Sequence, residues 1–223
     1  MIAFEDITLT AESLPEVVDF AAVFGNERPV ELEIGCGKGA FLLREAQAHP
    51  ERNYLGIEWA NEFYKFTADR MARRGVTNVR IMRTDARHFV ITRLPPACLD
   101  ALHVYHPDPW PKKRHHKRRL FNESFVAAAI RVLKPGGRWA IQTDHAEYFQ
   151  VMCEVTRDRP ELTPIEFTES TTVGEAEMLG TNFEIKYRRE GRQIHRLAFR
   201  RESIAQAIDF GACLVGSNQD GGR

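Results

Sequence analysis

The sequence predicts an α/β domain in which a doubly wound, mostly parallel sheet ends in an antiparallel hairpin. Apolar, β-rich runs alternate with segments of helical periodicity from residue 30 onward, and the connections between them are short. Two final β-rich runs, residues 183–189 and 193–200, are joined by Arg-Glu-Gly-Arg, which is typical of a hairpin turn. The length of 223 residues suits one such domain. In a sheet of this kind, ligands bind at the carboxyl ends of the strands.

Local signals bound the expected elements. A glycine loop, Gly-Cys-Gly-Lys-Gly, separates the first strand from a helix that ends at Ala48. Asn61 is suited to cap the next helix, which stops at Gly75. A later amphipathic helix is expected to end at Lys-Pro-Gly-Gly. In chain order, the strands are expected at residues 30–34, 54–58, 79–83, 99–105 and 138–143, with the second and third helices at residues 61–74 and 122–133.

Composition bounds the class of protein. We expect an N-terminal extension (1–29), one domain (30–203) and a C-terminal tail (204–223). No run approaches the roughly 18 to 20 consecutive apolar residues of a membrane span, and the acidic N-terminus does not resemble a signal peptide. We expect a cytoplasmic monomer or homodimer without a metal. Its cysteines show neither metal-ligand nor Cys-x-x-Cys spacing and are expected to be reduced thiols: Cys36, Cys98, Cys153 and Cys213.

Positive charge is concentrated in one segment. The chain has 31 Lys and Arg against 31 Asp and Glu, yet six of the basic residues lie in Lys-Lys-Arg-His-His-Lys-Arg-Arg at residues 112–119. The rest of the chain is therefore acidic. Such a run is either a solvated loop or a surface that binds nucleic acid, and composition leaves both open. His115 and His116 have no acidic residues at metal-ligand spacing and are interpreted as part of the same basic face.

Acidic residues stand at the ends of the first two predicted strands. Glu33 lies two residues before Gly35, where a carboxylate could face the cationic amino-acid end of S-adenosylmethionine or pair with a nearby arginine. Gly35 and Gly37 let the backbone turn sharply and approach a bulky ligand. Glu58 ends the second strand, in a position to accept hydrogen bonds from ribose hydroxyls. These features alone would also suit a nicotinamide cofactor.

Asp85 and Ala86 directly follow the third strand and discriminate better between the two cofactors. An acceptor at this place receives the amino group of an adenine ring, although Asp85 would equally cap the next helix. Acids at three consecutive strand ends are hard to explain by packing. A closing antiparallel hairpin and Leu-Lys-Pro-Gly-Gly before the fifth strand are typical of the Rossmann-like, seven-stranded class I methyltransferase sheet. The sequence therefore predicts S-adenosyl-L-methionine as the cofactor.

The fourth strand runs into His-Pro-Asp-Pro-Trp-Pro at residues 106–111. Proline has no backbone donor and fixes φ, so this segment leaves the strand and forms a rigid loop over the methyl group of the cofactor. Asp108 supplies an acceptor in that loop. Trp110 supplies an aromatic surface for a planar base, unless it is only a packed loop residue.

Pro-Asp-Pro-Trp followed by the basic run resembles the signature of bacterial tRNA (guanine-N7)-methyltransferases. The likeness spans about residues 30 to 200 and includes LEIGCGKG, GIEW, TDA, LKPGG and TNFE, although the glycine loop is shared by the whole superfamily. It implies methyl transfer to N7 of a guanine in tRNA, at guanosine 46 of the variable loop. It also implies cofactor contacts by Glu33, Glu58, Asp85 and Asp108, with Asp108 catalytic. The implied substrate and RNA contacts are Lys112, Arg114, Lys117, Arg118, Arg119, Asp144, Thr181, Asn182, Phe183 and Glu184.

Some implied contacts have simpler explanations. Asp144 would otherwise cap a helix that begins near Ala146, and Thr181 and Glu184 would be plain edge residues. Three rival classes also stay open: a methyltransferase of another RNA, a small molecule or a protein; a nicotinamide-dependent oxidoreductase; and an RNA-binding module without catalysis. A small-molecule or protein substrate leaves the basic run unexplained, whereas another RNA stays an alternative. The cofactor that binds decides the second class, and the intact glycine loop disfavours the third.

Guanine N7 carries an in-plane lone pair and no proton, so its methylation requires positioning and charge stabilisation rather than a base. We therefore expect Asp108 to orient the guanine and stabilise its developing positive charge. The N7 edge is buried in the deep major groove of an A-form helix, so the base must lie in a loop or be extracted from the tRNA fold.

Overall fold

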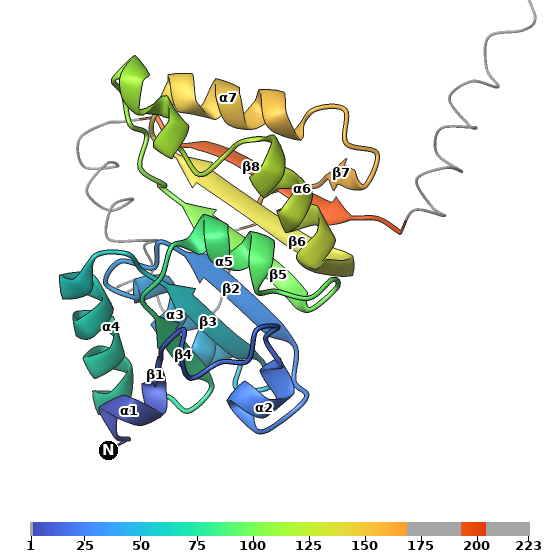
Figure 1. The fold of residues 1–223 in the computed structure, drawn as a ribbon. Helices are drawn as coiled ribbons and strands as arrows, with labels where there is room; N and C mark the ends of the chain where they lie inside the picture. Colours follow the sequence, from blue (N-terminus) through green and yellow to red (C-terminus); the bar gives the residue numbers. More distant parts are fainter. Residues whose placement is uncertain (1, 169–192, 204–223) are drawn as a thin grey trace, which may run out of the picture.

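The computed structural model describes residues 2–168 and 193–203, which form one eight-stranded sheet with helices on both faces (Figure 1). The strand order is β1-β4-β3-β2-β5-β6-β8-β7. The strands are β1 (Thr8–Leu9), β2 (Val30–Ile34), β3 (Asn53–Ile57), β4 (Val79–Met82), β5 (Leu99–Tyr105), β6 (Leu133–Thr143), β7 (Leu162–Pro164) and β8 (His195–Arg201). The helices are α1 (Phe4–Ile7), α2 (Phe20–Phe24), α3 (Ala40–Ala48), α4 (Asn61–Arg73), α5 (Ala86–Thr92), α6 (Glu123–Val132) and α7 (Ala146–Thr156), with the 3-10 helix η1 (Lys113–Arg118).

The strand β2 lies at the topological switch point of the sheet. It pairs in parallel with β3 on one side and with β5 on the other. The chain runs outward from β2 through β3 to β4 and then returns to continue through β5 and β6. The loops that follow β2 and β5 are therefore neighbours at the carboxyl edge, where sheets of this kind bind ligands.

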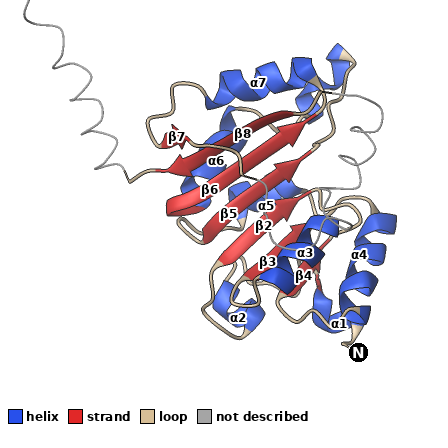
Figure 2. Ribbon diagram, turned by 180° about the vertical axis from the view of Figure 1, so that it is seen from behind, coloured by secondary structure: helices blue, strands red, loops and turns tan. Residues whose placement is uncertain are grey.

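Each face of the sheet has its own apolar core. The helices α5, α6 and α7 cover the face turned to the viewer in Figure 1, whereas α3 and α4 lie on the opposite face, seen in Figure 2. Leu32 and Ile34 point from β2 into the first core, and Leu42 and Met71 fill the second. Because side chains alternate along a strand, the intervening glutamate, Glu33, faces the side of α3.

The predicted fold class is confirmed, and the strands at residues 30–34 and 99–105 have the expected bounds. The fifth predicted strand begins earlier than expected, because Leu133 already pairs with Leu99 and the Leu-Lys-Pro-Gly-Gly segment belongs to β6. The antiparallel closure is formed by β8 against β6, with β7 on the other side of β8. The other predicted hairpin strand, residues 183–189, lies outside the described residues.

Two asparagines lie at the starts of predicted helices, but only one of them caps its helix. Asn122 caps α6, where its side chain accepts a hydrogen bond of 3.0 Å from the backbone N–H of Phe125. Asn61, expected as a cap, is the first residue of α4 instead. The cap position is Ala60, which makes no side-chain bond to the helix.

The described part of residues 1–29 packs on the sheet. Its strand β1 pairs in parallel with β4 and adds an eighth strand to the seven that the class suggests. Ile7 is fully buried. Arg93, which follows α5, donates hydrogen bonds to the backbone carbonyls of Ala11, Leu14, Pro15 and Glu16. A side chain of the domain thus fixes the path of this segment.

Candidate active site

The glycine loop joins β2 to α3 in a tight, left-handed path. Gly35, Gly37 and Gly39 have φ values of 75°, 52° and 66°, which residues with a Cβ rarely adopt. At Gly39 a Cβ would also lie 2.4 Å from the methyl carbon of Thr67, so α4 could not pack against the loop. The glycines therefore set both the turn and its close approach to the neighbouring helix.

Glu58 holds the glycine loop to the end of β3. One carboxylate oxygen accepts a hydrogen bond of 2.9 Å from the backbone N–H of Gly37, and the other accepts one of 2.8 Å from Ala60. Each carboxylate oxygen has a second acceptor site. Glu58 is thus a fixed structural link of the loop, with acceptor capacity left for the hydroxyls of a ribose.

Glu33 is a buried carboxyl without a hydrogen-bond partner for its Oε2 atom among the described residues. Only 1% of the residue is exposed. Burial raises the pKa of Glu33 to about 8; the Arg44 charge opposes the rise, and Glu58 and Glu45 add to it. The expected alternative, an ion pair with an arginine, is absent from the described residues, since Arg44 pairs with Glu45 instead. A buried acceptor that lacks a partner fits the ammonium group of an amino-acid ligand.

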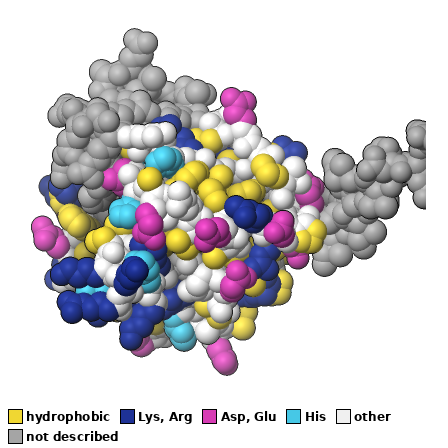
Figure 3. Space-filling model, turned by 90° about the horizontal axis from the view of Figure 1, so that it is seen from above, with side chains coloured by type: hydrophobic (Ala, Val, Ile, Leu, Met, Phe, Trp, Pro, Cys, Tyr) yellow, Lys and Arg dark blue, Asp and Glu magenta, His cyan; other side chains and the backbone are white. Residues whose placement is uncertain are grey.

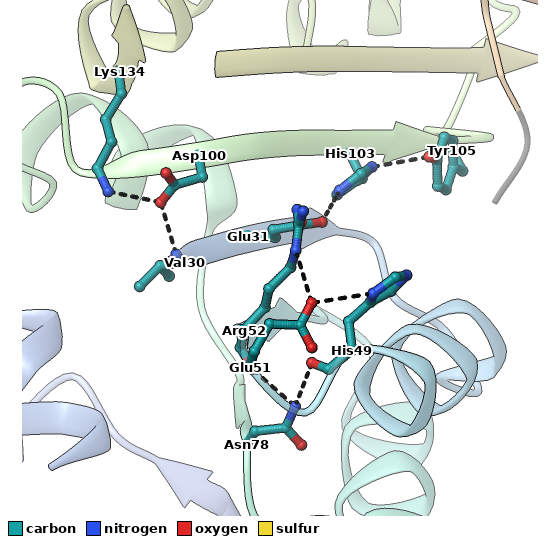
Figure 4. Close-up of polar contacts among 10 residues, drawn as sticks. All are labelled: Val30, Glu31, His49, Glu51, Arg52, Asn78, Asp100, His103, Tyr105 and Lys134. Carbon is teal, nitrogen blue, oxygen red and sulfur yellow. Dashed lines mark hydrogen bonds and ion pairs between the residues drawn. The ribbon is translucent and has the colours of Figure 1, made fainter. Parts of the chain in front are cut away.

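A second glutamate on the same face of β2, Glu31, is also buried, but its carboxylate is fully paired and its pKa is shifted in the opposite direction. The carboxylate of Glu31 lies 2.8 Å from Nε2 of His103 and 2.5 Å from Arg52, and His103 in turn contacts the Tyr105 hydroxyl at 2.9 Å (Figure 4). Burial opposes ionisation, yet the hydrogen bonds and charges of His103 and Arg52 lower the pKa of Glu31 to about 2. Glu31 is satisfied by its own protein, whereas the Oε2 atom of Glu33 has no partner in the part of the chain that the structure describes.

Asp85 performs the structural role that the sequence left open. Its side chain caps α5 by accepting a hydrogen bond of 2.9 Å from the backbone N–H of His88, and Ala86 is the first residue of that helix. Asp85 is exposed at the carboxyl edge of the sheet. The cap fixes its orientation there and uses one of its two oxygens, so the structure is compatible with both of the predicted roles.

The loop after β5 is strained at both ends. His106 and Trp110 have φ values of 50° and 44°, and a left-handed conformation at a bulky residue costs on the order of 1–3 kcal/mol. Between them, Asp108 is exposed. Trp110 contacts Arg118, whose guanidinium carbon is 4.9 Å from the ring centroid, and His115, whose ring is perpendicular to the indole at 5.8 Å.

Polar contacts from β6 hold the start of this loop. The backbone N–H of His106 donates to the carbonyl of Gln142 at 2.7 Å, and its ring contacts the side chains of Gln142 and Asp144. Asp144 does not cap α7, because His145 occupies the cap position and accepts from Tyr148. Asp144 thus lies at the base of the loop.

The basic run forms η1 and its flanks, and most of its cations point outward. Lys112, Lys113, Arg114, Lys117 and Arg118 are exposed, and none of them forms a salt bridge within the described residues. Figure 3 shows lysine and arginine side chains gathered on one side of the upper face of the molecule.

Arg119, which the family resemblance grouped with the RNA contacts, differs from its neighbours. It is 3% exposed and bound to Glu147. No sequence pattern pointed to Glu147, which is 28 residues away on α7. The remaining predicted substrate residues lie outside the described residues: Thr181, Asn182, Phe183 and Glu184.

Comparisons with known proteins agree with this geometry. A family model described as "Putative methyltransferase" matches residues 27–197. A tRNA (guanine-N(7)-)-methyltransferase of Rhodopirellula baltica is 36% identical over 87% of this chain and 74% of its own length. One of Syntrophotalea carbinolica is 47% identical over 63% of this chain, which covers 60% of that relative, less than two thirds of its length. These matches confirm the resemblance that the motifs indicated.

The fold has solved counterparts. A SAM-dependent O-methyltransferase of Thermotoga maritima superposes with a TM-score of 0.52 at 17% identity, over 82% of this chain and 63% of that one. At this identity the likeness concerns the fold alone. Within the described residues, no helix is long and apolar enough to span a membrane, and no group of three or more His, Cys, Asp or Glu is arranged to hold a metal ion.

Proposed function

Because the chain belongs to the tRNA (guanine-N7)-methyltransferase family, we propose that it transfers a methyl group from S-adenosylmethionine to N7 of a guanine in tRNA. We further propose guanosine 46 of the variable loop as the target, on the strength of the Pro-Asp-Pro-Trp motif and its basic run. The proposal rests on the features that lie together at the carboxyl ends of β2 and β5. There Glu33, whose Oε2 atom has no hydrogen-bond partner among the described residues, is followed along the chain by the strained loop with Asp108 and by the cationic η1.

The cofactor is proposed to bind along the ends of β2, β3 and β4. Glu33 would accept hydrogen bonds from its ammonium group, Glu58 from its ribose hydroxyls, and Asp85 from the adenine amino group beside the backbone of Ala86. When bound, the cofactor supplies an electrophilic methyl group. The left-handed glycine loop lets backbone approach it without a side chain in between.

Asp108 is proposed as the catalytic residue. The attacking N7 atom has no proton to lose, so the carboxylate orients the guanine edge and stabilises the positive charge that develops on the purine. Trp110 offers its ring in the same loop, already in contact with Arg118 and His115. Proline at residues 107, 109 and 111 keeps this loop from extending the strand.

The exposed cations of η1 are proposed to bind tRNA phosphates. Such contacts fix register and supply affinity without sequence information. Lys112, Arg114, Lys117 and Arg118 are the candidates that the structure leaves accessible. By the family resemblance, the remaining substrate contacts are proposed to be Asp144, Thr181, Asn182, Phe183 and Glu184.

The proposal is tested by incubating the protein with unmodified tRNA transcripts and methyl-labelled cofactor, followed by mass spectrometry of the nucleosides. We expect labelled 7-methylguanosine in the wild-type transcript and none in a transcript with adenosine at position 46. Label at another guanine would keep the activity and move the target. Label on a different nucleoside, or only on small molecules, would contradict the proposal.

A further inference from the structure

We propose that Arg119, acting with Glu147, is a positioning residue that holds the Asp108 loop in its strained shape and does not contact RNA. The expected effect of Arg119 on catalysis rests on the proposed function, because this loop carries Asp108, the proposed catalytic carboxylate. It separates Arg119 from the adjacent Arg118, which has the same chemistry and a different environment.

The guanidinium of Arg119 connects two elements that are far apart in the sequence. Its Nε atom donates a hydrogen bond of 2.8 Å to the carbonyl of Pro109, which lies between Asp108 and Trp110. Its two terminal nitrogens donate to the two carboxylate oxygens of Glu147 on α7, at 2.9 and 2.6 Å. This bidentate geometry fixes the plane of the guanidinium as well as its position.

The surroundings of Arg119 anchor it to the core. Its guanidinium carbon lies 4.8 Å from the ring centroid of Tyr148, which is fully buried and accepts a hydrogen bond from the backbone N–H of Phe121. Arg87 on α5 donates to the backbone carbonyls of Lys117 and Arg119. The cation is therefore held by α7 and by the Pro109 carbonyl, while α5 holds the backbone of residue 119, and the side chain is turned away from solvent.

The loop needs such an anchor because its conformation is locally unfavourable. His106 and Trp110, at its two ends, both have positive φ angles, and such strain persists only where the surroundings over-determine it. The contacts of His106 with β6 fix the first end. The bond from Arg119 to Pro109 fixes the second end, directly before Trp110. Asp108 lies between these two restraints.

A lysine at residue 119 would keep the charge but lacks the planar fork that makes three directed bonds to two partners. In Arg119→Lys, kcat at saturating tRNA and cofactor is expected to fall about 10- to 100-fold, the scale expected when a reacting group is misplaced by about 1 Å. The KM for tRNA and the slope of log affinity against log salt are expected to stay unchanged. In Arg118→Ala, by contrast, that slope should become shallower by about 0.7 to 0.9.

A second readout needs neither substrate nor catalysis. The indole N–H resonance of Trp110, identified by its loss in Trp110→Phe, is expected to shift or broaden in Arg119→Lys and in Glu147→Gln. The ion pair of Arg159 with Glu123 provides the control, because Glu123→Gln removes the same charge from a pair that does not include Arg119 and should leave the resonance unchanged. A Trp110 shift in a protein that methylates no tRNA would overturn the proposed function and keep this inference.

Two results would overturn the inference. One is an Arg119→Lys protein with wild-type kcat and an unmoved Trp110 resonance. The other is a shallower salt slope in Arg119→Ala, which would make Arg119 a phosphate contact. If the Arg119 variants fail to fold by circular dichroism, Glu147→Gln decides the matter, since the Glu147 side chain is 52% exposed and its loss is tolerable for folding. Glu147→Gln must then lower kcat and move the Trp110 resonance.

Discussion

Replacing Glu33 by glutamine should stabilise the cofactor-free protein at neutral and alkaline pH while weakening cofactor binding. The pKa of Glu33 is raised from its ordinary value of 4.5 to about 8, so the folded state holds a proton that the unfolded state releases above pH 4.5. This contribution to stability is fully present below pH 4.5 and is lost as the pH rises toward 8. Glutamine has the shape of the protonated acid and does not ionise.

The size of the stability difference between Glu33→Gln and the wild type follows from the pKa shift of Glu33. The wild type should lose a factor of about ten in its folding equilibrium, relative to Glu33→Gln, for each pH unit between 5 and 8. Summed over that range, the difference approaches about 5 kcal/mol as an upper limit, since the site relaxes around a buried charge. Cofactor binding should weaken by about 1.5–3 kcal/mol, the scale of one hydrogen bond to a charged group.

Urea unfolding of both proteins at pH 5.5, 6.5 and 7.5 without cofactor measures the first effect, and calorimetric titration with S-adenosylmethionine measures the second. Glu31→Gln is a matched control on the same face of the same strand. The pKa of Glu31 is lowered to about 2, despite its burial, by His103 and Arg52. Its contribution is present above pH 4.5 and is lost as the pH falls toward 2, so Glu31→Gln should destabilise the protein at neutral pH. Equal pH profiles for wild type and Glu33→Gln would refute the reasoning.

Three further predictions concern the proposed activity. Asp108→Asn should keep the loop and the fold but lower turnover by about 10²-fold, the scale of one lost charge-stabilising group; a labelled-methyl assay with a circular dichroism control measures it, and near wild-type activity would contradict the assignment. Glu58→Ala should weaken cofactor binding by about 1–3 kcal/mol, because it removes proposed ribose bonds and the link to the glycine loop; an unchanged dissociation constant in a titration without RNA would remove it from the site. Replacing Arg114, Lys117 and Arg118 by alanine should make the salt dependence of tRNA affinity shallower by about 2 to 3 units with cofactor affinity unchanged; unaltered salt dependence would mean that the run is only a solvated loop.

The sequence predicted the parts of the fold that depend on local patterns. The segments Val-Glu-Leu-Glu-Ile and Leu-Asp-Ala-Leu-His-Val-Tyr are short, rich in apolar and β-forming residues and followed by glycine or proline, so the bounds of β2 and β5 could be derived directly. The glycine loop at residues 35–39 and the proline loop at residues 106–111 could also be predicted, because each depends on residues with unusual backbone freedom or restraint. The pairing of Leu133 with β5 could not be predicted in this way. Lys-Pro-Gly-Gly has the local sequence of a turn, and it belongs to β6 only because β5 lies beside it.

The site could be located from the sequence, but the state of each side chain could not. Glu31 and Glu33 are two residues apart on one strand and are indistinguishable by pattern, yet one is ion-paired and the other has an unpartnered oxygen. Arg118 and Arg119 differ in the same way, one over Trp110 and the other bound to Glu147. Such differences arise from partners on distant elements, which periodicity does not encode.

Two unfavourable features of the site are of a kind that a ligand of the proposed reaction would offset. The buried Oε2 atom of Glu33 has no hydrogen-bond partner among the described residues, and the amino-acid end of S-adenosylmethionine would supply one. The exposed cations of η1 lie in one short segment, and RNA phosphates would offset their mutual repulsion. The strain at His106 and Trp110 sits between these two places. Since a ligand that binds only the folded state stabilises it, cofactor and tRNA should each raise the stability of the protein, the first mainly above neutral pH, where Glu33 is otherwise ionised without a partner.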